Sequence, residues 1–159
     1  MRKKRTLAWH FVGATLRDGS PIPNDGEWLY FLGDCKLCKS GLHWSRNPFD
    51  ALKYASGATL CLVEINHIIE EQEDKGVSRR RRIIARMDAT DMLQYFARQQ
   101  AISVLDNWQI EPDQSILDWL MGDYAAESAA ESAARSAAWS AAKTEFTQLV
   151  YECFSDFLD

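Results

Sequence analysis

Hydrophobic and polar residues alternate in several short segments of the first 87 residues, a pattern typical of β-strands. The clearest segment spans residues 59–65 and has apolar residues on both faces, which predicts a central strand of a sheet. The same pattern predicts further strands at residues 6–12, 28–32, 41–44 and 77–87. Residues 70–76 are charged and are expected to form a loop.

Helix signals interrupt this pattern once. Asn47 can cap a helix, Pro48 suits its first position and Asp50 favours the positive end of the helix dipole. Gly57 is a typical stop signal. We therefore expect one helix inserted between strands.

From residue 88 onward the hydrophobic period becomes helical, with helices expected at residues 88–108, 112–122 and 124–157. The last one contains a four-residue repeat, in which Glu127, Glu131, Arg135 and Trp139 are each followed by Ser-Ala-Ala. Alanine has the highest helix propensity, so this segment is strongly predicted to be helical. The predicted fold is α+β, with a small twisted, mostly antiparallel sheet of four or five strands, one inserted helix and two or three C-terminal helices. Residues 1–87 form the strand-rich part and residues 88–159 the acidic, alanine-rich helical part of one compact unit.

The end of the chain carries an apolar seam with heptad-like spacing. It consists of Trp139, Phe146, Val150, Cys153 and Phe157. Two interpretations stay open: packing within the chain, or a homodimer formed through this seam.

The net charge of the chain also differs between its first and its last part. Residues 1–100 hold 16 Lys and Arg against 12 Asp and Glu, a net charge of +4. Residues 101–159 hold 2 against 11, a net charge of −9. Such asymmetry concerns partners rather than fold. The four cysteines are too irregularly spaced for a disulfide scaffold, and no apolar run approaches the ~20 residues of a membrane helix. We expect a cytoplasmic protein that does not enter a membrane.

The acidic part suggests a contact surface for another protein. Carboxylates in a row can imitate nucleic-acid phosphates and occupy a basic channel of a partner. The candidate binding residues are Asp106, Glu111, Asp113, Asp118, Asp123, Glu127 and Glu131.

Two further groups of residues are candidate binding sites. The run Arg79, Arg80, Arg81 and Arg82 is a candidate phosphate-binding or nucleic-acid-binding site, although no aromatic residue is interleaved with it. Half of a zinc motif is formed by Cys35, Cys38 and His43, but the sequence has no second Cys pair to complete it. We therefore predict no metal site, and metal binding by these three residues stays an open alternative.

Residues 38–64 contain a distinctive block. Its matching positions are Cys38, Gly41, Leu42, His43, Ser45, Asn47, Pro48, Asp50, Ala51, Leu52, Tyr54, Ala55, Leu60, Cys61, Val63 and Glu64. The block resembles an uncharacterised domain family of bacteriophages, prophages and actinobacteria, whose members also carry alanine-rich helical tails. The resemblance covers residues 8–100 and implies no established activity.

The same block also resembles, more faintly, one element of ADP-ribosyltransferase-like folds. That resemblance implies that His10 orients the nicotinamide ribose of NAD, that His43 occupies a position usually held by Tyr, and that Glu64 polarises the acceptor. The first strand reads Trp9-His10-Phe11 without the usual Gly-Thr pair, and Glu64 comes earlier than such an acid normally does.

We therefore expect a non-enzymatic protein-binding module of phage or mobile-element type that needs no cofactor. The resemblance implies a partner such as a host nuclease or another nucleic-acid-binding or defence complex, contacted through the acidic helical half. An ADP-ribosyltransferase-like enzyme using His10, His43 and NAD is the first alternative. Nucleic-acid or phosphate binding through the arginine run is the second.

Overall fold

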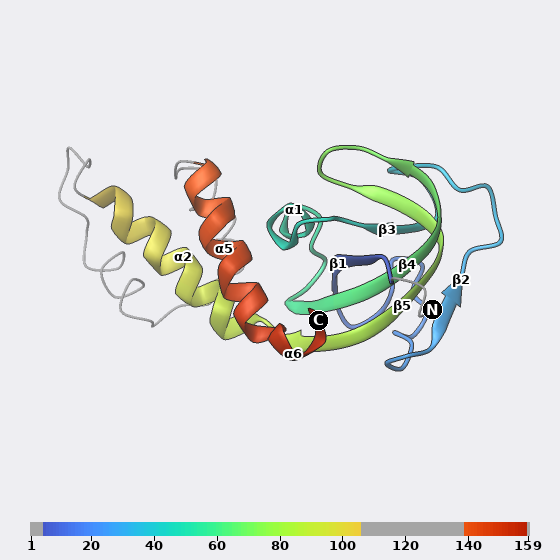
Figure 1. Ribbon diagram of the computed structural model, residues 1–159, viewed down its shortest axis with the longest axis horizontal. Helices are drawn as coiled ribbons and strands as arrows, with labels where there is room; N and C mark the ends of the chain where they lie inside the picture. Colours follow the sequence, from blue (N-terminus) through green and yellow to red (C-terminus); the bar gives the residue numbers. More distant parts are fainter. Residues whose placement is uncertain (1–4, 106–138, 159) are drawn as a thin grey trace. The chain divides into compact units, whose positions relative to one another are not determined.

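The computed structural model describes residues 5–105 and 139–158 (Figure 1). It contains strands and helices in the order β1 (Leu7–Val12), β2 (Trp28–Tyr30), β3 (Leu42–Trp44), α1 (Pro48–Leu52), β4 (Thr59–Glu71), β5 (Gly76–Asp88), α2 (Thr90–Leu105), α5 (Trp139–Cys153) and α6 (Ser155–Leu158). A five-stranded antiparallel sheet, one inserted helix and C-terminal helices confirm the predicted α+β class.

A long hairpin of β4 and β5 forms the centre of the sheet. Each of its strands has 13 residues, and the two are joined by a tight turn in which the Gln72 amide donates to the Lys75 carbonyl at 2.8 Å. The sheet order is β1-β4-β5-β2, and β3 also pairs with β5. Strand β4 lies between β1 and β5, so its predicted central position is confirmed. The predicted loop at residues 70–76 was too long, because both strands extend into it.

One face of the sheet carries a hydrophobic cluster. Its buried members are Ala8, Val12, Trp44, Cys61, Val63, Ile65 and Ile83. Leu16 and Ile22, from the loop between β1 and β2, pack against this cluster. The strands predicted at residues 6–12 and 59–65 also bury apolar side chains on the opposite face, namely Phe11, Leu60 and Leu62.

The opposite face of β1 is covered in part by the end of the chain. The Trp9 ring lies edge-on to Phe154 with centroids 5.2 Å apart, and it stacks on Tyr151 at 5.9 Å. Trp9 and Ser45 also exchange two backbone hydrogen bonds of 2.8 and 2.9 Å, which join the residue after β3 to β1. These contacts hold β1, β3 and the C-terminal residues together.

The chain divides into two compact units, residues 1–88 with 150–159 and residues 89–149. In the second unit, Phe96 of α2 packs edge-on against Phe146 of α5 with centroids 5.1 Å apart. Gln100 donates a hydrogen bond of 2.6 Å to Glu145 between the same two helices. An aromatic contact and a polar contact therefore fix this helix pair.

Some helix boundaries differ from the expected ones. Helix α1 ends at Leu52 rather than near Gly57, because the amides of Lys53, Tyr54 and Ala55 bond three residues back, as in a turn. The last helix is divided near Phe154 into α5 and α6. The expected helix at residues 112–122 and the first part of the expected helix at 124–157 lie outside the described residues.

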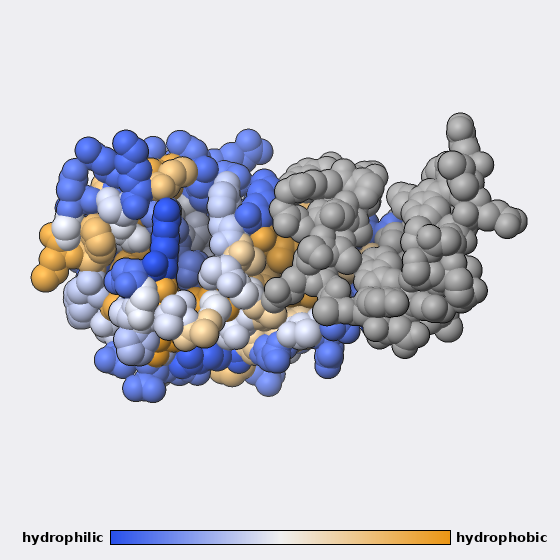
Figure 2. Space-filling view, turned by 180° about the vertical axis from the view of Figure 1, so that it is seen from behind, coloured by the Kyte–Doolittle hydropathy of each residue, from blue (hydrophilic) through white to orange (hydrophobic). Residues whose placement is uncertain are grey.

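The surface in Figure 2 is mostly hydrophilic, with separate hydrophobic patches among the described residues. No helix in the described parts of the chain combines the length and the apolar character needed to cross a membrane.

Candidate functional site

The block around residues 38–64 builds a short, capped helix. The side-chain oxygen of Asn47 accepts a hydrogen bond from the Phe49 amide at 2.9 Å, and Pro48 is the first residue of α1. The expected cap is confirmed. Phe49 and Asp50 are buried, and α1 contacts β1. Part of the block therefore determines where α1 begins and how it packs on β1.

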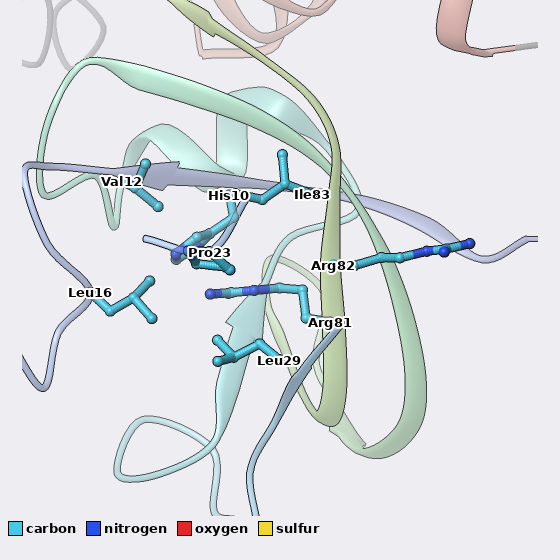
Figure 3. Close-up of a pocket in the computed structure, with 8 residues that line it drawn as sticks. All are labelled: His10, Val12, Leu16, Pro23, Leu29, Arg81, Arg82 and Ile83. Atoms are coloured by element: carbon cyan, nitrogen blue, oxygen red, sulfur yellow. The ribbon is translucent and has the colours of Figure 1, made fainter. Parts of the chain in front are cut away.

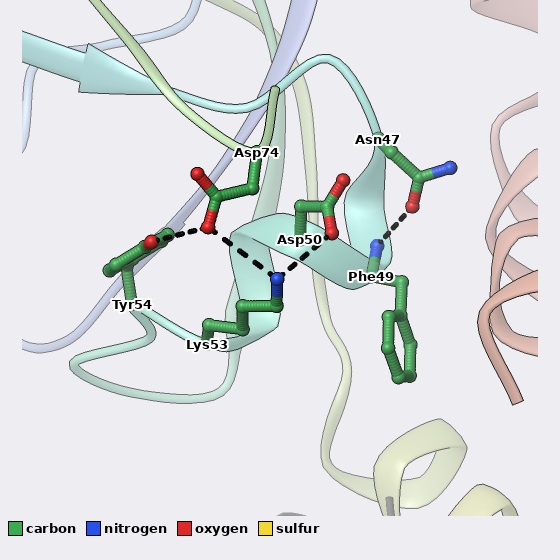
Figure 4. A network of polar contacts seen from close by, with 6 residues as sticks. All are labelled: Asn47, Phe49, Asp50, Lys53, Tyr54 and Asp74. Carbon is green, nitrogen blue, oxygen red and sulfur yellow. Dashed lines mark hydrogen bonds and ion pairs between the residues drawn. The ribbon is translucent and has the colours of Figure 1, made fainter. Parts of the chain in front are cut away.

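A polar network attaches α1 to the turn of the β4–β5 hairpin (Figure 4). The Tyr54 hydroxyl donates to Asp74 at 2.6 Å, and Lys53 lies 3.5 Å from the same carboxylate oxygen and 3.3 Å from Asp50. The hydrogen bond from Tyr54, helped by the positive charge of Lys53, lowers the pKa of Asp74. This attachment gives Asp50, Lys53 and Tyr54 a structural role.

His43 of β3 is held by the loop that precedes it. Its Nε2 accepts a hydrogen bond of 2.9 Å from the Cys38 amide, and its ring also bonds to the backbone of Gly41. Burial lowers the pKa of His43. The ring is therefore neutral and has its Nε2 lone pair engaged, which leaves little freedom for proton transfer at that atom.

The half zinc motif has a similar structural role. Cys35 is buried beside Ser78, whose carbonyl lies 3.8 Å from its Sγ, whereas Cys38 is exposed with a φ of 64°. A metal would need the His43 lone pair that already accepts from Cys38. In the part of the chain that the structure describes, no group of three or more His, Cys, Asp or Glu side chains is arranged to hold a metal ion.

His10 lies in a small pocket on the face of the sheet that carries the hydrophobic cluster of Ala8 and Val63 (Figure 3). The lining residues are His10, Val12, Leu16, Pro23, Leu29, Arg81, Arg82 and Ile83. Burial, and then the nearby charges of Arg81 and His43, lower the pKa of His10 well below its ordinary value. His10 is therefore neutral at physiological pH.

Glu64 belongs to the other face of the sheet. In the register of β1 and β4, His10 lies opposite Cys61 and Ala8 opposite Val63, so Glu64, next to Val63, points away from His10. It pairs with Arg82, its neighbour on β5, at 2.6 Å. The structure thus separates Glu64 from His10.

The four arginines at 79–82 alternate between the two faces and have different surroundings. Arg79 donates to the carbonyls of Phe31 and Gly33, and Arg82 pairs with Glu64. Arg81 is buried and donates to the His43 carbonyl. Figure 3 shows Arg81 and Arg82 leaving β5 in opposite directions. The run is therefore not a single solvated patch.

Aromatic residues that the sequence pattern missed lie against the outward pair of arginines. Trp28 lies opposite Arg82, and Tyr30 opposite Arg80, in the register of β2 and β5. The Arg80 guanidinium lies 4.6 Å from the Trp28 ring centroid and 4.9 Å from that of Tyr30, while Arg82 lies 4.7 Å from Trp28. Only cross-strand pairing reveals this neighbourhood, because about 50 residues separate the two segments.

The predicted acidic binding residues, Asp106, Glu111, Asp113, Asp118, Asp123, Glu127 and Glu131, lie outside the described residues. In the C-terminal seam, Phe146 and Val150 are buried, whereas Cys153 and Phe157 are exposed. The homodimer interpretation stays a prediction.

Comparison with known proteins agrees with this description at the level of the family. No curated protein matches the chain, and no solved structure does. A model of the domain of unknown function DUF7666 matches residues 7–95, a segment that begins at β1 and ends within α2. It therefore covers the whole sheet, the inserted helix and the arginine run. The chain belongs to the DUF7666 family, which is an uncharacterised domain family, as the block predicted.

Proposed function

We propose that this protein is a non-enzymatic protein-binding module. The observation that carries the proposal is that Glu64 lies on the face of the sheet opposite His10 and that His43 is engaged by its own loop. Glu64 is engaged with Arg82 on the face of the sheet opposite His10, and the His43 ring holds the Cys38 loop. An enzyme needs such groups to converge on one reacting atom. Glu64 and His43 instead have structural partners, which are Arg82 and the Cys38 amide.

The proposed contact surface is the acidic part of the chain. The net charge of −9 over residues 101–159 contrasts with +4 over residues 1–100. A surface with this charge attracts a basic partner and accelerates their encounter. Proteins that bind nucleic acid carry such basic surfaces. The partner we propose is therefore a nucleic-acid-binding protein, which the acidic residues engage in place of nucleic acid.

The resemblance to phage and prophage domains suggests the biological setting. We propose that the protein is of mobile-element type, acts in the cytoplasm and inhibits a host nuclease or defence complex. No cofactor is part of this proposal.

The experiment uses two double charge reversals of equal size. Glu127→Lys with Glu131→Lys alters the proposed surface, whereas Glu70→Lys with Glu73→Lys alters positions at the turn end of the β4–β5 hairpin. Each full-length variant is used to capture partners from the natural host, and the captured protein is then purified for direct titration over a series of salt concentrations. We expect the first variant to bind more weakly, with a shallower salt dependence. Equal binding by both variants and the unmodified protein would contradict the proposal.

A second candidate function rests on the aromatic neighbours of the arginine run. Trp28 and Tyr30 provide flat surfaces beside Arg80 and Arg82, and Tyr30 is exposed. Aromatic rings and arginines together are typical of surfaces that bind single-stranded nucleic acid. If this candidate is correct, a labelled single-stranded oligonucleotide binds with salt-dependent affinity and quenches Trp28, and Tyr30→Ala with Arg80→Ala weakens it. No binding at low salt would remove this candidate.

A further inference from the structure

Arg81 is the most unusual charged residue in the described part of the chain. Its side chain is buried, with 6% of the residue exposed, yet no described carboxylate pairs with it. Among the described residues its single hydrogen-bond acceptor is the backbone carbonyl of His43. Burying an unpaired guanidinium is energetically costly, and buried charges in proteins are normally paired.

Burial weakens but does not remove this charge. It lowers the pKa of Arg81 to about 10, which leaves the guanidinium protonated at neutral pH. The group with the strongest electrostatic effect on it is the thiol of Cys61, whose own pKa is raised to about 11 by burial. A neutral thiol does not balance a full positive charge. The interior of the sheet therefore holds a cation without a counter-charge from the described residues.

The guanidinium points into the pocket that also contains His10. Figure 3 shows its nitrogen atoms directed toward Leu16 and lying between Leu29 and Pro23. Leu16 and Pro23 belong to the loop between β1 and β2, so this loop forms one wall of the pocket. The N–H groups that His43 does not use are therefore available on the pocket side.

The size of the pocket limits what can occupy it. Its internal volume is about 10 Å³, which is room for about one water molecule. A whole nucleotide or a whole phosphate does not fit, but one oxygen of a terminal group does, with the rest of the ligand outside the pocket. Guanidinium groups bind carboxylate and phosphate oxygens through two parallel hydrogen bonds. Neutral His10 can donate a further one.

We propose that Arg81 and His10 form a binding site for the terminal oxyanion group of a small ligand, a carboxylate or a phosphate. The oxyanion supplies the counter-charge that Arg81 lacks, while Leu16, Pro23 and Leu29 surround it with apolar contacts. This site lies in the strand-rich half and goes beyond the proposed protein contact, because it does not depend on the acidic residues.

The test is an NMR titration of the full chain with two probes, inorganic phosphate and acetate, at constant ionic strength. A bound anion favours the protonated imidazole, so we expect saturable shifts of the His10 ring resonances and a rise in the pKa of His10. Saturation by one probe alone supports the site and identifies the group as phosphate or carboxylate. His10 resonances that move with neither probe would overturn the proposal.

Two variants separate a specific site from general charge effects. Arg81→Met removes the guanidinium, and Arg98→Met removes an equal charge from α2. We expect the first to weaken anion binding by about tenfold or more, the scale of one lost charge-assisted hydrogen bond, and the second to leave it unchanged. Equal affinity in both variants would overturn the proposal. If Arg81→Met does not fold, Arg81→Lys replaces it, because lysine keeps the charge but lacks the paired N–H donors of the guanidinium. Unaltered anion affinity in Arg81→Lys would then overturn the proposal.

Discussion

Arg82 donates two hydrogen bonds, of 2.9 and 2.6 Å, to a single carboxylate oxygen of Glu64, the residue directly opposite it on β4. The pair crosses the central hairpin on the face opposite His10. It joins the last residue of the family-like block to the last residue of the arginine run. The family-like block and the arginine run, which both look functional in the sequence, are thus joined by this ion pair.

Replacing Glu64 by Gln tests this relationship. The variant keeps the shape of the side chain but loses its charge, so we expect the free energy of unfolding to fall by about 1–2 kcal/mol. Urea unfolding measures the change. In a double-mutant cycle with Arg82→Leu, the two effects should be clearly non-additive. Simple additivity would mean that the ion pair contributes nothing.

Gly41 is required for a different reason. Its φ is 107°, and a Cβ at this position would collide with the Cys35 Sγ and lie 2.6 Å from the Val77 Cγ2. Gly41→Ala should therefore destabilise the fold by at least about 2 kcal/mol. Gly19 is the matched control, because its φ is 83° and a Cβ added there would meet no atom within 4 Å. Gly19→Ala should cost only about 1 kcal/mol. Equal losses would show that contact with Cys35 is unimportant.

The Tyr54–Asp74 hydrogen bond makes stability sensitive to acid. Because this bond lowers the pKa of Asp74 below its ordinary 3.8, the carboxylate contributes stability above that pH. The contribution is lost as pH falls through the lowered value. Tyr54→Phe should remove roughly 0.5–1 kcal/mol at neutral pH and reduce the acid-dependent loss. Chemical unfolding of both proteins between neutral and strongly acidic pH measures this. A parallel pH profile in the variant would contradict the role of Tyr54.

His10 makes stability depend on pH in a higher range. Its pKa in the fold lies well below the ordinary 6.5, so the unfolded chain binds more protons below pH 6.5. Stability should therefore fall as the pH drops below 6.5. His10→Gln should flatten this dependence, with the remainder due to His43, whose pKa burial also lowers. The control His67→Gln changes an exposed histidine and should keep the full slope. An undiminished slope in His10→Gln would disprove the assignment.

The elements with local signals were the ones that could be predicted. Asn47, Pro48 and Asp50 predict the start of α1, and apolar residues on both faces predict the central position of β4. The second half of β4 could not be predicted, because residues 66–71 are partly or fully exposed and polar or mixed in character. They form a strand because β5 pairs with them, and that pairing is a tertiary property.

The candidate sites show the same limit. The sequence shows four consecutive arginines, but alternation along β5 sends Arg81 inward and Arg82 outward, and the partner strands give them unlike neighbours. Trp28 and Tyr30 reach the run from β2, which no spacing rule within 79–82 indicates. The sequence made His43 a catalytic candidate only through the resemblance to ADP-ribosyltransferase-like folds. Its hydrogen bond from Cys38 supports the structural interpretation.

We propose that the protein binds a partner without catalysis. The most direct test compares two full-length variants with the unmodified protein. One carries charge reversals at Asp118, Asp123, Glu127 and Glu131, and the other carries His10→Ala with His43→Ala. Both are titrated against the captured partner, and mass spectrometry examines the partner for ADP-ribose after incubation with NAD. We predict that the acidic variant loses binding, that the histidine variant keeps it, and that no adduct forms. Adducts that disappear in the histidine variant would contradict the account.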